Sequence, residues 1–257
     1  MVFNSIFFIF CFLPVFMMIY YLVPGKLRNL LLFLGSLIFY AWGEPVYVIL
    51  MLFSSIFNYY MGTELERLYY DDRKQKINLI FSIIINLAVL VFFKYYGFLL
   101  NTIGGIIGIH IPHPELSLPI GLSFYTFRNL SYLFDIYLSK VSAQRNFLTF
   151  AVYSTMFPYT SAGPIVRYTD IETQLKQRTI NISKFGTGAE LFVKGLAKKV
   201  LLADNLSVLY SSICGHPQMS VFTSWLGILA YTMQLYFDFS GYSDMAIGLG
   251  KMLGLDR

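Results

Sequence analysis

The chain has 257 residues, of which 56% are hydrophobic and only 13% are charged. An ordinary soluble domain carries about 25% charged residues, so the composition excludes that class and predicts a polytopic membrane protein. The formal net charge of +5 is typical of basic cytoplasmic loops, and we expect no nucleic-acid partner. Two cysteines, Cys11 and Cys214, are far apart in the sequence, which predicts neither a disulfide framework nor a metal site.

Seven apolar segments are predicted to be membrane-spanning helices within one all-α transmembrane domain covering residues 1–257. In chain order they are residues 2–23, 27–42, 45–61, 77–100, 118–138, 189–213 and 221–249. The first segment lacks a basic n-region and a cleavage site, so we interpret it as a retained span rather than a signal peptide. Residues 147–166 are also apolar, but Pro158 and the Gly163-Pro164 pair break helices. That stretch is predicted to be re-entrant or broken.

Basic residues gather in alternate connections between these segments, and this pattern predicts the orientation of the chain. Connections 43–44, 101–117 and 214–220 contain no lysine or arginine. Because cytoplasmic loops carry the excess of basic residues, we predict an outside N-terminus and a cytoplasmic C-terminus. The pattern alternates only if both ends of 147–166 are cytoplasmic, and Lys94, near an outer helix end, is the exception. The residues placed in the cytoplasm are Lys26, Arg28, Arg67, Arg73, Lys74, Lys76, Lys140, Arg145, Arg167, Lys176, Arg178, Lys184, Lys251 and Arg257.

Charged residues occur inside the predicted span 118–138. Tyr125, Arg128, Tyr132 and Asp135 are three or four residues apart, so they share one helix face. In one interpretation this face is a cavity wall on which Arg128 holds an anionic group. In the other, Arg128 and Asp135 form an internal ion pair that fixes helix packing.

The predicted span 221–249 contains two carboxylates, Asp238 and Asp244, in an otherwise apolar run. A charged group at the centre of a membrane costs about 2.5–3.5 kcal/mol on insertion scales, so these groups should face protein or a wet cavity. The two are six residues apart, roughly 120° around a helix, and do not form a tight acid pair. The Ser240-Gly241 pair between them is a possible helix break. One face of polar and small residues suits either cavity lining or helix packing, and it comprises Tyr231, Gln234, Asp238, Gly241, Met245 and Gly248.

The three histidines are predicted to lie in outer loops. His110 and His113 belong to a proline-rich loop, and His216 precedes Pro217. None is adjacent to a plausible nucleophile, and no nucleotide-binding loop, nucleophile elbow or metal cluster is present in the sequence. We therefore assign no catalytic residue and no metal ligand in this chain.

Three segments together resemble the membrane-bound O-acyltransferase family, in its bacterial branch of alginate O-acetylation and D-alanyl transfer. They are residues 118–135 (LPIGLSFYTFRNLSYLFD), residues 145–168 with Phe157-Pro158 and Gly163-Pro164, and residues 234–254, which begin QLYFDFSGYSDMAIG. The first hundred residues fit as well, with YAWG at 40–43 and FFKYY at 92–96. The resemblance follows the whole chain in order.

This resemblance implies an enzyme of the bacterial inner membrane that transfers an acyl group, with acetyl expected. The donor would be a cytoplasmic thioester of the acetyl-coenzyme A kind, with no bound cofactor, and the acceptor a hydroxyl of an extracytoplasmic polysaccharide. A soluble extracytoplasmic transferase often completes the reaction in this family. The candidate tunnel residues are Arg128, Asp135, Arg167, Gln234, Tyr236, Asp238, Tyr242 and Asp244.

Two departures from the family pattern concern residues, and a third concerns length. Arg128 and Tyr159 stand where glutamine is expected. Family members are nearly twice as long, and their catalytic histidine lies in the second half. We therefore expect this chain to be an N-terminal portion that is inactive by itself. The alternatives are a transporter or flippase, which also has broken helices and intramembrane charges, and a non-catalytic scaffold or remnant.

Overall fold

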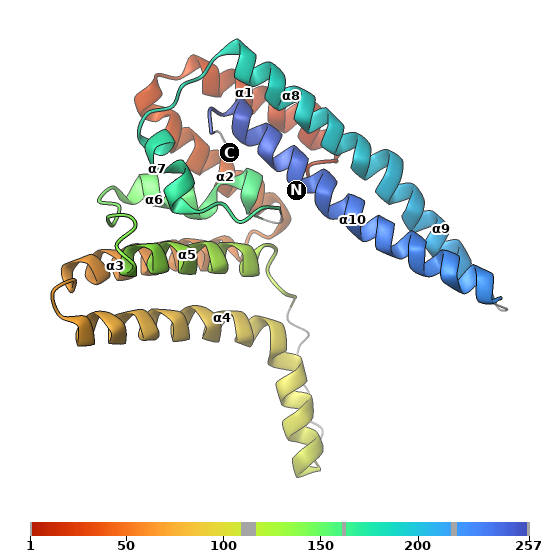
Figure 1. Ribbon diagram of the computed structural model, residues 1–257, viewed down its shortest axis with the longest axis horizontal. Helices are drawn as coiled ribbons and strands as arrows, with labels where there is room; N and C mark the ends of the chain where they lie inside the picture. The colour runs from red at the N-terminus through yellow and green to blue at the C-terminus, as the bar shows by residue number, and fades with distance from the viewer. Residues whose placement is uncertain (1, 109–116, 161–162, 217–219, 256–257) are drawn as a thin grey trace. The chain divides into compact units, whose positions relative to one another are not determined.

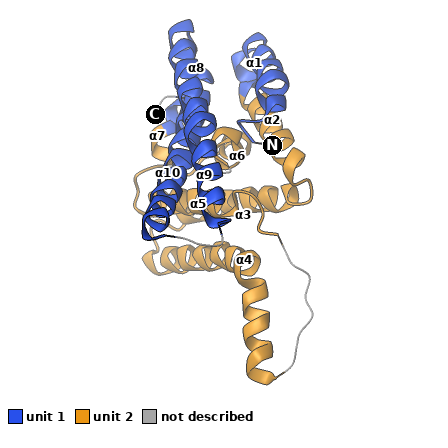
Figure 2. Ribbon diagram, turned by 90° about the vertical axis from the view of Figure 1, so that its right-hand side faces the viewer, with its two compact units in different colours: residues 1–28, 162–164, 171–257 blue, residues 29–161, 165–170 orange. Residues whose placement is uncertain are grey.

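A computed structural model describes residues 2–108, 117–160, 163–216 and 220–255, and every regular element within these ranges is a helix (Figure 1). The predicted all-α fold is therefore confirmed. The chain divides into two compact units, shown in different colours in Figure 2. The first unit comprises residues 1–28, 162–164 and 171–257, and the second comprises residues 29–161 and 165–170. His110 and His113 lie outside the described residues.

Five helices make up most of the second unit. They are α2 (Arg28–Gly43), α3 (Val48–Arg67), α4 (Asp72–Ile107), α5 (Leu122–Tyr137) and α6 (Phe147–Thr155). Helices α3, α4 and α5 pack against one another, and α6 packs against α3 and α5. Four predicted spans coincide with α2 to α5, although α3 and α4 extend beyond the predicted ends. An apolar cluster at the core of this unit is formed by Tyr40, Met51, Leu90, Leu122 and Tyr125.

The first unit contains the two ends of the chain. A π-helical stretch, η1 (Phe8–Phe12), leads into α1 (Leu13–Leu22), and a 3₁₀ turn, η2 (Gly25–Leu27), follows. The predicted span 189–213 lies within α8 (Ile182–Ala197), a second π-helical stretch, η4 (Lys198–Ala203), and α9 (Asp204–Cys214). Helix α10 (Val221–Met252) packs along all three (Figure 1). The short helix α7 (Tyr168–Lys176) crosses the boundary between the units.

Side-chain caps mark where several helices begin. The carboxylate of Asp71 accepts a hydrogen bond from the Lys74 amide at 3.1 Å at the start of α4. Asn146 begins α6 and Asn181 begins α8 in the same way. These residue types satisfy amide groups that the first helical turn leaves without partners. The Lys74 side chain also bonds the Asp71 carboxylate and holds its pKa below the ordinary value.

The segment 147–166 is broken, as predicted. Helix α6 ends at Thr155, and a 3₁₀ turn, η3 (Phe157–Tyr159), contains Pro158. Proline has no amide hydrogen, so α6 cannot continue through a bond from residue 158 to the carbonyl of Ser154. The side of the membrane from which this segment enters stays a prediction.

Two of the described helices, α3 and α4, are long and apolar enough to cross a membrane. Helix α4 has 36 residues, or about 54 Å at 1.5 Å per residue, which exceeds the roughly 30 Å hydrocarbon core. The predicted span 77–100 therefore occupies only part of it. The count of seven spans stays a prediction.

A pair of amides joins two of these long helices. The side-chain nitrogen of Asn58 on α3 donates to the oxygen of Asn86 on α4 at 3.0 Å, and the reverse bond measures 2.9 Å. Both side chains are buried, with 0% and 5% of their surface exposed. Such reciprocal bonds fix the register of two apolar helices, because any shift leaves an amide unsatisfied.

We predict that Asn58→Leu lowers the free energy of unfolding by about 1–2 kcal/mol, since the Asn86 amide loses its partner in an apolar setting. The double variant Asn58→Leu/Asn86→Leu should cost less than the sum of the two single variants. A double-mutant cycle measured by denaturant unfolding in detergent checks this. Strict additivity would contradict the coupling.

Candidate functional site

Glycine contacts bring α8 and α10 close together. A Cβ atom at Gly195 would lie 2.5 Å from the carbonyl oxygen of Gly241, and one at Gly188 would lie 2.6 Å from that of Gly248. Neither distance is possible for a real side chain, so the two backbones touch at both points. The two glycines on each helix are seven residues apart, which is two helical turns, and this spacing aligns the antiparallel pairs.

This contact pairs two lysines with the two carboxylates found in the sequence. Lys199 Nζ lies 2.5 Å from Asp238 and 2.9 Å from Asp204. Lys198 Nζ lies 2.6 Å from Asp244 and 3.1 Å from the hydroxyl of Ser240. These groups are partly buried, with exposed side-chain fractions of 25% for Lys199 and 22% for Asp244. We call Lys198, Lys199, Asp204, Asp238 and Asp244 the lysine–aspartate cluster.

Both lysines of the cluster begin the π-helical stretch η4. A π-helical turn widens the helix by one residue and is frequent at functional sites. Consecutive residues of an α-helix point about 100° apart. Lys198 and Lys199 nevertheless both reach carboxylates on α10. Sequence reasoning did not include Lys198 and Lys199 among the candidate site residues. The signal that finds them is the seven-residue glycine spacing shared by the two helices.

The remaining candidates on α10 have varied surroundings. The helix is continuous through Ser240 and Gly241, so the possible break is absent. Tyr242 stacks on Phe3, with ring centroids 4.8 Å apart, and Tyr236 is exposed. The Oε1 atom of Gln234 is buried without a hydrogen-bond partner among the described residues.

Substitution of Gly195 tests the contact between α8 and α10. We predict that Gly195→Ala costs about 1–3 kcal/mol of stability, because the new methyl group meets backbone rather than a movable side chain. Gly186→Ala, on the same helix, has nothing within 4 Å and should be neutral or stabilising by up to about 1 kcal/mol. Thermal unfolding in detergent measures both. Equal melting temperatures would contradict the close contact.

Arg128 of α5 lies in the second unit and is 1% exposed. Its guanidinium donates to the carbonyl oxygens of Tyr153 at 3.0 Å and Ser154 at 3.3 Å, and also to that of Tyr159. In a continuous helix the amides of residues 157 and 158 would bond the first two carbonyls. Pro158 has no amide hydrogen, and the amide of Phe157 instead donates to Ser36 Oγ at 3.0 Å. Arg128 therefore supplies the donors that the broken segment lacks.

The other predicted members of this face, Tyr125, Tyr132 and Asp135, are also buried. Tyr132 is fully buried, and its hydroxyl accepts from the amide of Gln144 at 2.9 Å. Asp135 is 5% exposed and lies 3.8 Å from Lys140. Both charged side chains are buried, Arg128 against backbone carbonyl groups and Asp135 beside Lys140. Their pairing with each other stays a prediction. Arg167 is exposed.

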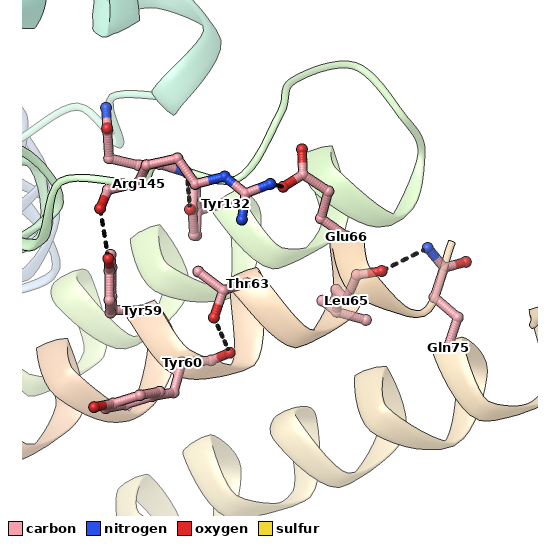
Figure 3. A network of polar contacts seen from close by, with 9 residues as sticks. Tyr59, Tyr60, Thr63, Leu65, Glu66, Gln75, Tyr132 and Arg145 are labelled. Carbon is pink, nitrogen blue, oxygen red and sulfur yellow. Dashed lines mark hydrogen bonds and ion pairs between the residues drawn. The ribbon is translucent and has the colours of Figure 1, made fainter. Parts of the chain in front are cut away.

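A polar network continues this region toward the ends of α3 and α5 (Figure 3). Arg145 pairs with Glu66 at 2.5 Å, and its carbonyl accepts from the Tyr59 hydroxyl at 2.7 Å. Gln75 donates to the carbonyl of Leu65 at 3.0 Å. These bonds tie the segment after α5 to α3 and support the position of the broken segment that follows.

Arg128→Ala should lower stability by about 3–5 kcal/mol, because three buried carbonyl groups lose their donor. Arg128→Gln keeps two donors on a shorter side chain and should lose less. Arg67→Ala is the control, since the Arg67 side chain is 77% exposed and pairs only along its own helix. Denaturant unfolding of the three variants checks the order. If Arg128→Ala is as stable as the parent, a ligand-contact role gains support instead.

The structure places no potential metal centre among the residues it describes, where no three histidine, cysteine or acidic side chains converge. His216, just after α9, is exposed. The lysine–aspartate cluster holds its carboxylates in contact with ammonium groups. The cluster can therefore orient polar groups and bind charge.

Comparisons with known proteins define the class of this protein. The family model of the membrane-bound O-acyltransferases matches residues 42–257. A probable alginate O-acetylase of Pseudomonas aeruginosa is 42% identical over 99% of this chain and 50% of its own length. The corresponding Azotobacter vinelandii protein is 40% identical over 99% of this chain and 52% of its own. A peptidoglycan O-acetyltransferase of Helicobacter pylori is 32% identical over 99% of this chain and 54% of its own.

The chain belongs to the membrane-bound O-acyltransferase family, whose members are membrane-embedded acyltransferases. The resemblance seen in the sequence is thus confirmed at the level of the family. The chain spans about half the length of the curated relatives it matches.

Proposed function

We propose that the protein containing this chain is an O-acetyltransferase of the bacterial inner membrane. The hydroxyl oxygen of an extracytoplasmic polysaccharide attacks the carbonyl carbon of a cytoplasmic thioester of the acetyl-coenzyme A kind. The carbon–sulfur bond breaks, and the proton of the hydroxyl leaves with the thiol. The observation that carries this proposal is the 42% identity, over 99% of the chain, with a protein named a probable alginate O-acetylase.

The names of the relatives point to a carbohydrate polymer as the acceptor. The polymer is alginate in the names of the Pseudomonas aeruginosa and Azotobacter vinelandii proteins, and it is peptidoglycan in the name of the Helicobacter pylori protein. They support a carbohydrate hydroxyl as the acceptor class. A soluble extracytoplasmic transferase is proposed as the partner, and no bound cofactor is required.

The proposed membrane arrangement has seven spans and one segment that enters and leaves on the cytoplasmic side. Its N-terminus is outside, and residue 257 is cytoplasmic. The basic connections support this orientation. The broken helix at α6 and η3 supports a re-entrant course for residues 147–166, because a helix break in a membrane needs internal donors such as Arg128.

The roles of the residues follow from their chemistry. A hydroxyl is a weak nucleophile near neutral pH and needs a base within hydrogen-bond reach. Asp238 and Asp244 are held in lysine pairs, so we propose that they position groups along the acyl path. Tyr236, Tyr242 and Gln234 are proposed as its lining, with Arg167 at the cytoplasmic entrance. The base would be a histidine in another part of the whole protein.

The alternatives have weaker support. A transporter or flippase would also contain intramembrane charges, and a scaffold would need no chemistry. The relatives named above are all described as acetylating enzymes, which favours the transferase.

A chimera tests the proposal. Residues 1–257 replace the matching half of the Pseudomonas aeruginosa alginate O-acetylase in cells that lack that enzyme. We expect the chimera to restore acetyl groups on secreted alginate, measured by NMR of the polymer, and residues 1–257 alone to restore none. Within the chimera, Asp238→Asn should lower acetylation about tenfold or more, because Lys199 loses a charged partner near the acyl path.

Glu190→Gln is the matched control, because it alters an exposed lysine–glutamate pair on α8. It should leave acetylation within about twofold of the parent chimera. All variants are compared at equal membrane abundance. If a well-expressed chimera leaves alginate unacetylated but acetylates peptidoglycan, the proposed acceptor becomes peptidoglycan. A chimera that acetylates neither polymer would contradict the proposed transfer.

A further inference from the structure

A groove in the first unit combines positive charge with apolar surface. It has a volume of about 740 Å³ and lies between the end of α1, the start of α2 and the segment that leads into α8. This volume is in the range of small-molecule sites. Arg28 and Arg178 line it, and none of the described lining residues is acidic. Neither arginine belongs to the lysine–aspartate cluster.

Tyr20 places both guanidinium groups. Its ring is fully buried, and the Arg28 guanidinium carbon lies 5.7 Å from the ring centroid. Its hydroxyl accepts from Arg178 Nη1 at 2.6 Å and donates to the carbonyl of Leu253 at 2.8 Å, at the end of α10. Two cations from segments 150 residues apart in the sequence therefore converge on one side chain. An arrangement that concentrates like charge in this way favours a bound anion.

The walls of the groove are held in place by packing. Gly254 has a φ of +77°, and a Cβ there would lie 3.1 Å from Ile180 and 3.2 Å from the carbonyl of Thr179. Tyr21 donates to the carbonyl of Met252 at 2.5 Å and meets the ring of Phe185 edge to face at 5.9 Å. The segment that carries Arg178 is thus fixed against α10, so a ligand would find its contacts already formed.

Polar and apolar groups are both available to a ligand. The side chains of Arg28 and Arg178 line the groove and carry the polar groups. The Phe185 ring and the Ile182 side chain, which is 91% exposed, provide apolar surface in the same groove. Guanidinium groups match phosphate oxygens in pairs of parallel hydrogen bonds, and Arg is favoured over Lys for that purpose.

We propose that this groove binds a phosphate ester, with Arg28 and Arg178 on the phosphate oxygens and Phe185 and Ile182 against the part of the ligand next to the phosphate. Two sources offer this chemistry. One is the headgroup of an acidic phospholipid, and the other is the phosphate of a soluble coenzyme A thioester. The inference concerns binding alone and does not depend on acetyl transfer.

Direct binding separates the two sources. The full chain in neutral detergent is titrated with dioctanoylphosphatidylglycerol, with coenzyme A, and with dioctanoylglycerol, which has the same acyl chains but no phosphate. Bound ligand is counted by native mass spectrometry, and thermal unfolding gives an independent measure. We expect at least one phosphate ester to bind and dioctanoylglycerol to bind about tenfold more weakly or not at all.

Arginine variants assign the binding to the groove. Arg28→Gln and Arg178→Gln should each weaken it by about tenfold or more, since each loses charged hydrogen bonds to the phosphate. Arg28→Lys keeps the charge but cannot form the paired hydrogen bonds, so its affinity should lie between those of the parent and Arg28→Gln. Arg67→Gln is the control, because it removes a charge from an exposed arginine on α3. Each variant is first shown to be monodisperse, with a melting temperature near that of the parent.

Each result has a defined meaning. Loss of phosphatidylglycerol binding in both glutamine variants supports a lipid headgroup, and loss of coenzyme A binding supports the soluble source. Equal binding of dioctanoylglycerol, equal binding by the glutamine variants, or no binding of either phosphate ester would overturn the proposal. Turnover is not measured, so such a failure would leave the proposed acetyl transfer untouched.

Discussion

The backbone contact between α8 and α10 is the constraint on which the lysine–aspartate cluster depends. Glycine at positions 188, 195, 241 and 248 removes the side chains that would keep the helices apart. The axes then approach closely enough for the lysines of η4 to reach carboxylates on α10. In hydrocarbon there is no hydrophobic force between helices, so close packing and polar bonds provide the association energy. At the contact between α8 and α10, the glycines permit close packing and the lysine–aspartate pairs add polar bonds.

The second unit contains a helix that is broken within an apolar stretch of the sequence. Unpaired carbonyl groups away from water are costly, and Pro158 creates one by removing an amide hydrogen. The amide of Phe157 is diverted to Ser36, which leaves a second carbonyl without its helical donor. A single buried arginine compensates for both, and its charge strengthens the bonds it donates. Arg128 is therefore first a structural residue, although it also marks the place where the chain must bend.

The two positions at which the resemblance predicts glutamine are in contact. Arg128 donates to the carbonyl group of Tyr159. A glutamine at position 128 has two donors on a shorter side chain, whereas arginine has five on a longer one. The arginine can thus serve carbonyl groups on both sides of the break in the segment.

The sequence by itself determined the membrane class, the all-helical fold, the broken segment and the family, because composition, apolar segment length, proline and motif order are local properties. It also identified the charged residues Arg128, Asp135, Asp238 and Asp244 as unusual. Only the tertiary structure decided their partners, because a charge is paired with whatever residue the packing brings within about 4 Å, however distant in sequence. Lys198 pairs with Asp244 because glycines let their two helices pack closely, and Arg28 and Arg178 both contact the side chain of Tyr20. Hydropathy and spacing describe one helix at a time, whereas these sites arise from two or more.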